Sequence, residues 1–422
     1  MLAPVIVALY ALLPAMLLSS HSLLSGAFYA LIAASLVLLI QQRFGGVIAQ
    51  TRKYCGLIAS YSVLFLAVAA SSFYHGDWAG ANSEGALRFF LGLWILLLAL
   101  PHIEIHRLRH AIWGVYVGSI VSTATLLWLI INVEPRPLTP GVILTTYSSI
   151  MLLLGAISVY SIKWQLTASP RLEGLVKVLV AVITFIGFLA AQTRTGLLGL
   201  PLFILLAIVL FVGIKKPCRV LAWLVASVIL IAAAIGSDNA LRSRIVEGVQ
   251  EVRACQGENS TQPSSMCIRL QLWRTAVDAG ISHPWVGLGK GGKFIEYMES
   301  VAVPKGLAAP YVVTEQFGEP HNDLLLILAG FGFPGVLGLL LIYLVPSVYF
   351  LPRLLKHEAS HCSRAAAAMG LAVCLGFFLF GFTETMFRRM NTIGFYVAMV
   401  ALFIVLSDPR SSRQEMSSPP TL

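Results

Sequence analysis

Long runs of apolar residues follow one another from the first residues of the chain almost to its end. A helix that crosses a bilayer needs about 17–25 mostly apolar residues. We place runs of that kind at 3–20, 22–41, 56–72, 86–101, 111–132, 141–162, 175–192, 195–214, 219–236, 322–350, 365–386 and 391–407. The pattern predicts an all-α polytopic membrane protein with about twelve transmembrane helices.

One stretch, residues 237–321, interrupts this pattern, because its roughly 85 positions contain no run long enough to span a bilayer. The interruption divides the chain into spans one to nine at 1–236, the loop at 237–321, spans ten to twelve at 322–407 and a tail at 408–422. Within the loop, the helical spacing of apolar residues in "LRSRIVEGVQEV" and "IRLQLWRTAVDAGISHP" predicts two helices. We therefore expect a large, mostly helical loop between spans nine and ten.

Composition and charge support the same class and add an orientation. Hydrophobic residues make up 58% of the chain and charged residues only 11%, whereas soluble domains carry about 25% charged residues. Lys and Arg concentrate on alternate loops, and cytoplasmic loops carry the excess of these residues. The bias predicts that both chain ends are cytoplasmic and that the loop 237–321 is external. The net charge of +10 then reflects topology, and we expect no nucleic-acid partner.

The chain has six cysteines, and two of them, Cys255 and Cys267, share the predicted external loop. An oxidising compartment outside the cytoplasm permits a disulfide between them. The alternative is a pair of free thiols.

Several patterns that carry chemistry elsewhere are incomplete here. The segment "GLGKGGKF" at 287–294 has Phe294 where a phosphate-binding loop has Ser or Thr. His102, His106 and His110 have a helical spacing that could hold a metal, but their basic neighbours favour lipid headgroup contact instead. No Asp-x-Asp pair and no Cys-x-x-Cys motif occurs. We expect no metal site and no cofactor.

Polar residues with chemical potential lie at the start of the tenth predicted span, in "EPHNDLLLILAGFGFPG". Pro320 suits the first turn of a helix, where its missing N–H costs nothing. His321, Asn322 and Asp323 are then expected to form the helix start, whose free N–H groups favour an anion. A histidine near that end tends toward the neutral form, which accepts a proton.

Three arginines break the expected charge bias on the external side. Arg194 lies in a short turn between spans seven and eight, and Arg388 and Arg389 lie between spans eleven and twelve. A positive charge at membrane depth is costly and usually functional. Together with His321, these side chains are expected to gather at the external membrane face, where an anionic lipid headgroup is the matching ligand.

Three segments resemble signatures of the O-antigen ligase and polymerase superfamily. "RTG" at 194–196, which opens a predicted span, is similar to its Arg-Ser/Thr-Gly/Ala signature. "RLQLWRTAVDAGISHPWVGLGKGGKF" is similar to its Arg-x3-Trp motif, here Arg269 and Trp273, followed by Pro-x2-Gly-x-Gly. "HNDLLLILAGFGFPG" is similar to its His-Asn-x2-Leu motif with a downstream Gly-x2-Gly. The motifs occur in order around one long loop. The span count and the position of the loop also agree, so the resemblance covers nearly the whole chain.

The resemblance implies a glycosyltransferase at the periplasmic face of the bacterial inner (cytoplasmic) membrane. Its donor would be undecaprenyl diphosphate-linked O-antigen and its acceptor the lipid A-core oligosaccharide. It implies that His321 is the catalytic histidine and that Arg194 and Arg269 engage the donor diphosphate. Weaker expectations of substrate contact fall on Asn322, Asp323, Arg388, Arg389, Trp273 and Gln192.

Elementary chemistry agrees with this implication. The diphosphate is already a good leaving group, so the reaction needs no ATP. It needs a base for the acceptor hydroxyl and cations for the developing charge, and direct displacement would invert the anomeric carbon. The main alternatives are an O-antigen polymerase, a protein-directed transferase of the same superfamily, and a lipid-glycan transporter. The transporter would place charged residues deep within several spans, whereas most mid-span positions here are apolar.

Overall fold

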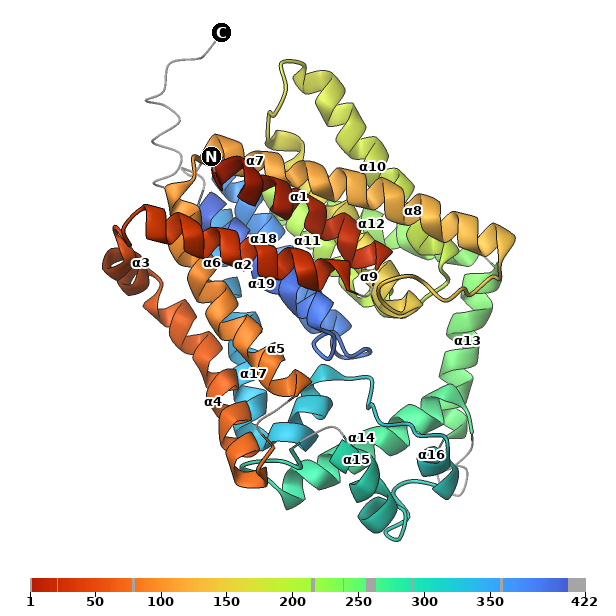
Figure 1. The fold of residues 1–422 in the computed structure, drawn as a ribbon. Coiled ribbons are helices and arrows are strands. Elements are labelled where there is room, and N and C mark those ends of the chain that lie inside the picture. The colour runs from red at the N-terminus through yellow and green to blue at the C-terminus, as the bar shows by residue number, and fades with distance from the viewer. Residues whose placement is uncertain are drawn as a thin grey trace.

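The computed structural model describes residues 2–20, 22–77, 80–213, 217–237, 239–255, 263–289, 292–356 and 360–408. These residues form helices and connecting loops without a strand (Figure 1). The predicted polar tail lies outside the described residues except for Asp408.

The helices fall into three groups along the chain. The helices before the long loop are α1 (Leu2–Ser19), α2 (Leu23–Gln41), α3 (Val47–Lys53), α4 (Cys55–His75), α5 (Ala81–Leu87), α6 (Leu93–Ala99), α7 (Ile105–Arg109), α8 (Trp113–Asn132), α9 (Leu144–Tyr160), α10 (Pro170–Ala190), α11 (Gly199–Phe211) and α12 (Pro217–Ser237). The loop contains α13 (Asn239–Ala254), α14 (Ser265–Ser282), α15 (Gly292–Tyr297) and α16 (Pro310–Thr314). After it come α17 (Asp323–Leu355), α18 (His361–Phe380) and α19 (Met390–Leu406).

The expected polytopic helical architecture is confirmed. In the described part of the chain, nine helices are long and apolar enough to cross a membrane. Shorter apolar helices at Thr195–Phe211, Cys218–Ile229 and Met390–Leu406 coincide with the remaining predicted runs. The total of about twelve spans therefore stays a prediction.

The core of the bundle is formed by α18 and α19, which are buried along most of their length. Small side chains allow this packing, since Ala365 to Ala368 are all fully buried. Gly338 of α17 lies directly against the backbone of Leu64 in α4, where a Cβ atom would overlap it. Small residues at helix contacts let backbones approach closely, which is how membrane helices gain van der Waals attraction.

The long loop folds into helices α13 to α16, and α14 to α16 gather beyond one end of the bundle, below it in Figure 1. The two predicted loop helices are observed as α13 and α14, and α14 ends at Ser282, just before His283-Pro284. The structure joins Cys255 and Cys267, with Cα atoms 5.3 Å apart, between these two helices. The disulfide between these two thiols stays a prediction.

The long loop is hydrogen-bonded to the bundle at a break in helix α17. Gly332 has φ 65° and ψ −163°, so the helix is interrupted there. The exposed backbone is satisfied by the loop segment, because Leu288 N donates to Ala329 O at 2.8 Å and Phe333 N donates to Pro284 O at 2.8 Å. A Cβ at Gly287 would overlap the backbone of Gly330. The glycines of the near phosphate-loop pattern thus allow close backbone docking.

The three histidines considered for a metal do not share one continuous helix. His102 ends a short 3-10 turn, His106 lies in α7, and His110 begins another 3-10 turn. The extended residue Ile103 separates the first from the second. The helical face that their spacing suggests is therefore not formed.

Candidate active site

The start of α17 is held by the loop between α18 and α19. Asp323 N donates to Gly381 O at 2.7 Å, and the buried Asp323 carboxylate accepts from Phe387 N at 3.1 Å. The Asn322 amide donates to Phe382 O at 3.1 Å. These two predicted site residues are therefore engaged in joining segments distant in the sequence.

His321 lies immediately before the helix cap. The Asn322 side chain accepts from Leu325 N at 3.1 Å, so Asn322 is the cap and the helix begins at Asp323. The expectation that Pro320 and His321 belong to the first helical turn is wrong, because the cap lies after them. His321 instead has φ 48°, a left-handed conformation that non-glycine residues adopt rarely and often at functional sites.

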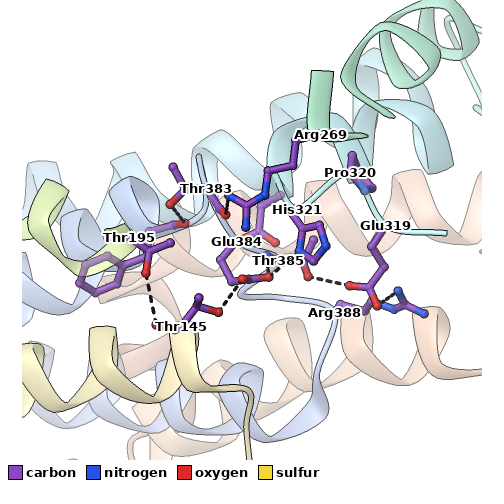
Figure 2. A network of polar contacts seen from close by, with 12 residues as sticks. Thr145, Thr195, Arg269, Glu319, Pro320, His321, Thr383, Glu384, Thr385 and Arg388 are labelled. Carbon is purple, nitrogen blue, oxygen red and sulfur yellow. Dashed lines mark hydrogen bonds and ion pairs between the residues drawn. The ribbon is translucent and has the colours of Figure 1, made fainter. Parts of the chain in front are cut away.

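A buried carboxylate contacts the His321 ring (Figure 2). His321 Nδ1 lies 3.0 Å from Glu384 Oε1, and the Glu384 side chain is only 2% exposed, against 33% for His321. Thr145 Oγ1 donates to Glu384 Oε2 at 2.7 Å, and Thr385 N donates to Oε1 at 3.1 Å. Burial raises the pKa of Glu384, but the contacts with His321, Thr145 and Thr385 outweigh it and hold that pKa below its ordinary value.

Arg269 reaches the same place from α14. Its Nη1 donates to Thr383 O at 3.3 Å, next to Glu384 (Figure 2). Burial lowers the pKa of Arg269, attraction to Glu384 raises it, and repulsion from Arg194 lowers it further. Trp273, one helical turn along, donates from Nε1 to Pro320 O at 2.7 Å. The Arg269 face of α14 is therefore tied to the residue before His321.

Arg194 follows α10 in a tight turn. Gln192 adopts φ 49° in this turn. The Arg194 guanidinium lies against Gly248 of α13, where a Cβ atom would overlap it. Thr195 Oγ1 donates to Thr145 O at 3.4 Å, which links the turn to the helix whose threonine binds Glu384. Arg194 and Arg269 are thus brought into one electrostatic neighbourhood.

Arg388 and Arg389 are adjacent in the sequence, but their side chains contact different parts of the structure. Arg388 pairs with the Glu319 carboxylate, which also accepts from Thr385 Oγ1 at 2.8 Å (Figure 2). Burial, followed by repulsion from Arg389, lowers the pKa of Arg388. Arg389 precedes α19 and lines a cavity of about 580 Å³ together with Arg136. The two arginines were expected to gather with His321 at one place, but only Arg388 lies in the polar network around His321.

The residues that sequence reasoning missed are acidic and polar. Glu384 and Glu319 are the partners of His321 and Arg388, and Thr145 and Thr385 position those carboxylates. A signal was present in "GFTETMFRRM", where an acidic residue shares a short loop with two arginines. Its connection to a histidine in another part of the chain is not visible in the sequence.

Comparison with known families gives a match over part of the chain. Residues 179–340 match the family described as O-antigen ligase. The matched range contains Arg194, Arg269 and His321, whereas Thr145 and Glu384 lie outside it. No curated protein matches the chain. The resemblance inferred from the three motifs is therefore confirmed, and this match supports an O-antigen ligase-family protein.

Proposed function

Because residues 179–340 match the O-antigen ligase family, we propose that this chain is the ligase itself. It would transfer O-antigen polysaccharide from undecaprenyl diphosphate to the lipid A-core oligosaccharide at the periplasmic face of the inner membrane. Both substrates are membrane-anchored in this proposal, so the reacting groups must meet just above the lipid headgroups. His321, at the start of a membrane helix, suits that height.

The observation that carries the proposal is the 3.0 Å contact between His321 Nδ1 and Glu384 Oε1. A carboxylate can only accept, so Nδ1 carries a proton, and in the neutral form of the ring Nε2 then presents a lone pair. In the proposed step, Nε2 takes the proton of the acceptor hydroxyl while its oxygen forms a bond to the anomeric carbon. The bond from that carbon to the diphosphate oxygen breaks, and undecaprenyl diphosphate leaves with its electron pair. The configuration at the anomeric carbon inverts.

Glu384 acts in this proposal as a positioning residue. Its burial and its bonds from Thr145 and Thr385 leave the carboxylate little freedom. A fixed anion at Nδ1 selects one histidine tautomer and stabilises the imidazolium that forms when Nε2 takes a proton. Charge-assisted hydrogen bonds of this kind are about twice as strong as neutral ones.

Arg269 and Arg194 are proposed to bind the donor diphosphate. Guanidinium groups bind phosphate oxygens through two parallel N–H bonds and stay charged at any physiological pH. Their mutual repulsion, which contributes to the lowered pKa of Arg269, is relieved when an anion binds between them. Since arginines then balance the leaving charge, the proposed reaction uses neither divalent metal nor ATP and should survive EDTA.

The Arg136–Arg389 cavity is a candidate for the acceptor side. Neither arginine has an ion pair within the described part of the chain, and Leu138 beside them is 91% exposed. Two cations next to an exposed apolar side chain suit a phosphate of a membrane-anchored lipid. We propose that the acceptor or a neighbouring lipid places a phosphate there.

The runner-up is an O-antigen polymerase, since the same donor and the same His321–Glu384 pair would serve a second lipid-linked glycan as acceptor. The experiment that separates them uses purified protein with undecaprenyl diphosphate-linked O-antigen and either lipid A-core or a second donor molecule. The ligase extends lipid A-core and leaves the donor pool unpolymerised. Elongation of the lipid-linked glycan alone would establish the polymerase. Movement of the glycan across a bilayer without a new glycosidic bond would establish a transporter.

A further inference from the structure

A second charged cavity lies at the opposite end of the bundle from His321. It has a volume of about 750 Å³, and its lining includes Arg52, Lys53 and Arg353. Helix α17 begins at Asp323, directly after the cap residue that follows His321, and Arg353 lies near its other end, which is Leu355. The cavity and the His321–Glu384 pair are therefore separated by most of the length of α17.

The cavity is positively charged. Three of its lining residues are cations from α3 and α17, and the one lining carboxylate, Asp408, pairs with Lys53. Arg52 and Arg353 have no carboxylate partner in the ranges that the structure describes. The Arg353 guanidinium stacks over the Tyr349 ring, 3.5 Å from its centroid, which fixes the direction of the charge. An anion is the matching ligand.

Two buried polar atoms at the cavity lack a partner within the described residues. They are Arg353 Nε, a donor, and Gln50 Oε1, an acceptor. Buried groups without a hydrogen bond are uncommon because water is lost and nothing replaces it. A ligand that offers both a phosphate oxygen and a hydroxyl donor would satisfy both atoms.

The surroundings indicate that this ligand has apolar chains. Ile48 of α3 is 78% exposed and Phe44 is 55% exposed, and Ile103 and Ile105 line the cavity wall. A short helix with exposed apolar side chains beside two basic residues is typical of a segment lying at a membrane interface. A soluble phosphate would leave these apolar groups facing water.

We propose that this cavity binds an anionic glycerophospholipid with hydroxyls in its headgroup, such as phosphatidylglycerol, from the leaflet opposite the His321 face. The phosphate would lie between Arg52 and Arg353, and a headgroup hydroxyl would donate to Gln50 Oε1. Basic cavities between membrane helices bind anionic headgroups in this manner. The site does not depend on the proposed transfer reaction, and its test involves no glycan.

The test is native mass spectrometry of the full chain in detergent, with phosphatidylglycerol, phosphatidylcholine or inorganic phosphate added in turn. We expect retention of one phosphatidylglycerol and a rise in the midpoint of thermal unfolding with that lipid. Arg353→Gln and Arg52→Gln should each weaken the retained binding by about tenfold or more. Arg107→Gln is the matched control, because Arg107 is a half-exposed cation paired with Glu104 at 2.8 Å and does not line the cavity.

Each other outcome overturns the proposal. Equal retention in wild type, Arg52→Gln and Arg107→Gln would show unspecific lipid adhesion. Stabilisation by inorganic phosphate as large as that by phosphatidylglycerol would identify a soluble anion as the ligand. Equal retention of phosphatidylcholine would show that the headgroup is not recognised. Arg52 is exposed, so its variant keeps the test decisive if Arg353→Gln folds poorly.

Discussion

The two ends of helix α17 both place charges at a membrane border, and they do so in opposite ways. At the start, Glu384 is almost fully buried against His321, and Glu319 pairs with Arg388. At the other end, Arg353 projects into a wide cavity whose only lining carboxylate, within the described residues, is paired with Lys53. The first end has fixed partners for its histidine, whereas the second leaves cations available.

This difference separates two uses of charge in one protein. Burying a carboxylate is unfavourable unless hydrogen bonds and a cation compensate it, and at Glu384 they do. Such an arrangement holds a donor or acceptor in one direction, which proton transfer requires. At the other end, Arg52 and Arg353 have no carboxylate partner within the described residues, which leaves their charge available to a lipid phosphate.

Replacing the histidine at the start of α17 is expected to have the largest effect on activity. We expect His321→Ala to lower the rate of glycan transfer by about 10²–10⁴-fold, the usual contribution of a general base. His283→Ala is the control, because His283 is an exposed histidine of the same loop. Its ring packs near the ring of Tyr297, with centroids 6.0 Å apart, and not against Glu384. Transfer rates are measured with purified protein on defined donor and acceptor lipids. A near-normal rate of transfer by His321→Ala would show that His321 is not the general base.

The arginine of α14 tests whether geometry or charge alone matters at this end. We expect Arg269→Lys to lower transfer by about 10²-fold, because a lysine keeps the charge but cannot form the two parallel bonds. Arg274→Lys on the exposed side of the same helix should leave the rate unchanged. Rates at saturating and limiting donor give kcat and KM separately. Full activity of Arg269→Lys would show that a point charge is sufficient.

The disulfide concerns the loop that covers only the His321 end. If Cys255 and Cys267 are bridged, as the structure has them, replacing both by Ser should lower the free energy of unfolding by ~3 kcal/mol. Cys55→Ser is the control, because Cys55 is a free, exposed thiol. Mass spectrometry of non-reduced peptides checks the link directly. Complete alkylation of both thiols in oxidised, unfolded protein would exclude it.

Docking of the loop against the break in α17 can be tested with a pair of glycines. Gly287 and Gly306 both have positive φ, but only Gly287 lies against another backbone. Both Ala variants share the conformational cost, so we expect Gly287→Ala to destabilise by about 1–3 kcal/mol more than Gly306→Ala. Midpoints of thermal unfolding, with hydrogen exchange at 329–333, provide the readout. Equal destabilisation would mean that the close approach is not maintained.

The smallest expected effect is on the pH dependence of stability. The folded-state pKa of Glu384 lies below its ordinary value, because the contacts with His321, Thr145 and Thr385 outweigh burial. Its contribution to stability is therefore full above the ordinary carboxyl pKa of about 4.3 and is lost as pH falls through the lower folded value.

We expect Glu384→Gln to lack that loss. Its midpoint of thermal unfolding should fall less between pH 6 and 3 than that of wild type, by about 1 °C. An unfolding entropy of about 2.1 cal/mol/K per residue converts ~1 kcal/mol into that shift for a chain of 422 residues. Scans at several pH values with both proteins make the comparison. Identical slopes would show that the carboxylate does not gain stability from the histidine.

Local patterns along the chain were sufficient to predict the helices, the class of protein and most of the cations of interest. Apolar runs are local features, and in a bilayer a run of that length must form a helix because its backbone polar groups have no water to bind. The three motifs that contain Arg194, Arg269 and His321 are equally local. The matched family range includes these three residues and supports the inferred resemblance.

The arrangement of the site depends on contacts between distant segments of the chain. Glu384 and His321 are 63 residues apart, and neither helical period nor charge bias relates positions at that distance. The adjacent Arg388 and Arg389 diverge because one meets Glu319 and the other precedes a helix beside Arg136. Side-chain partners depend on which helices pack together, and packing is a property of the whole chain, whereas a sequence pattern is read within one segment.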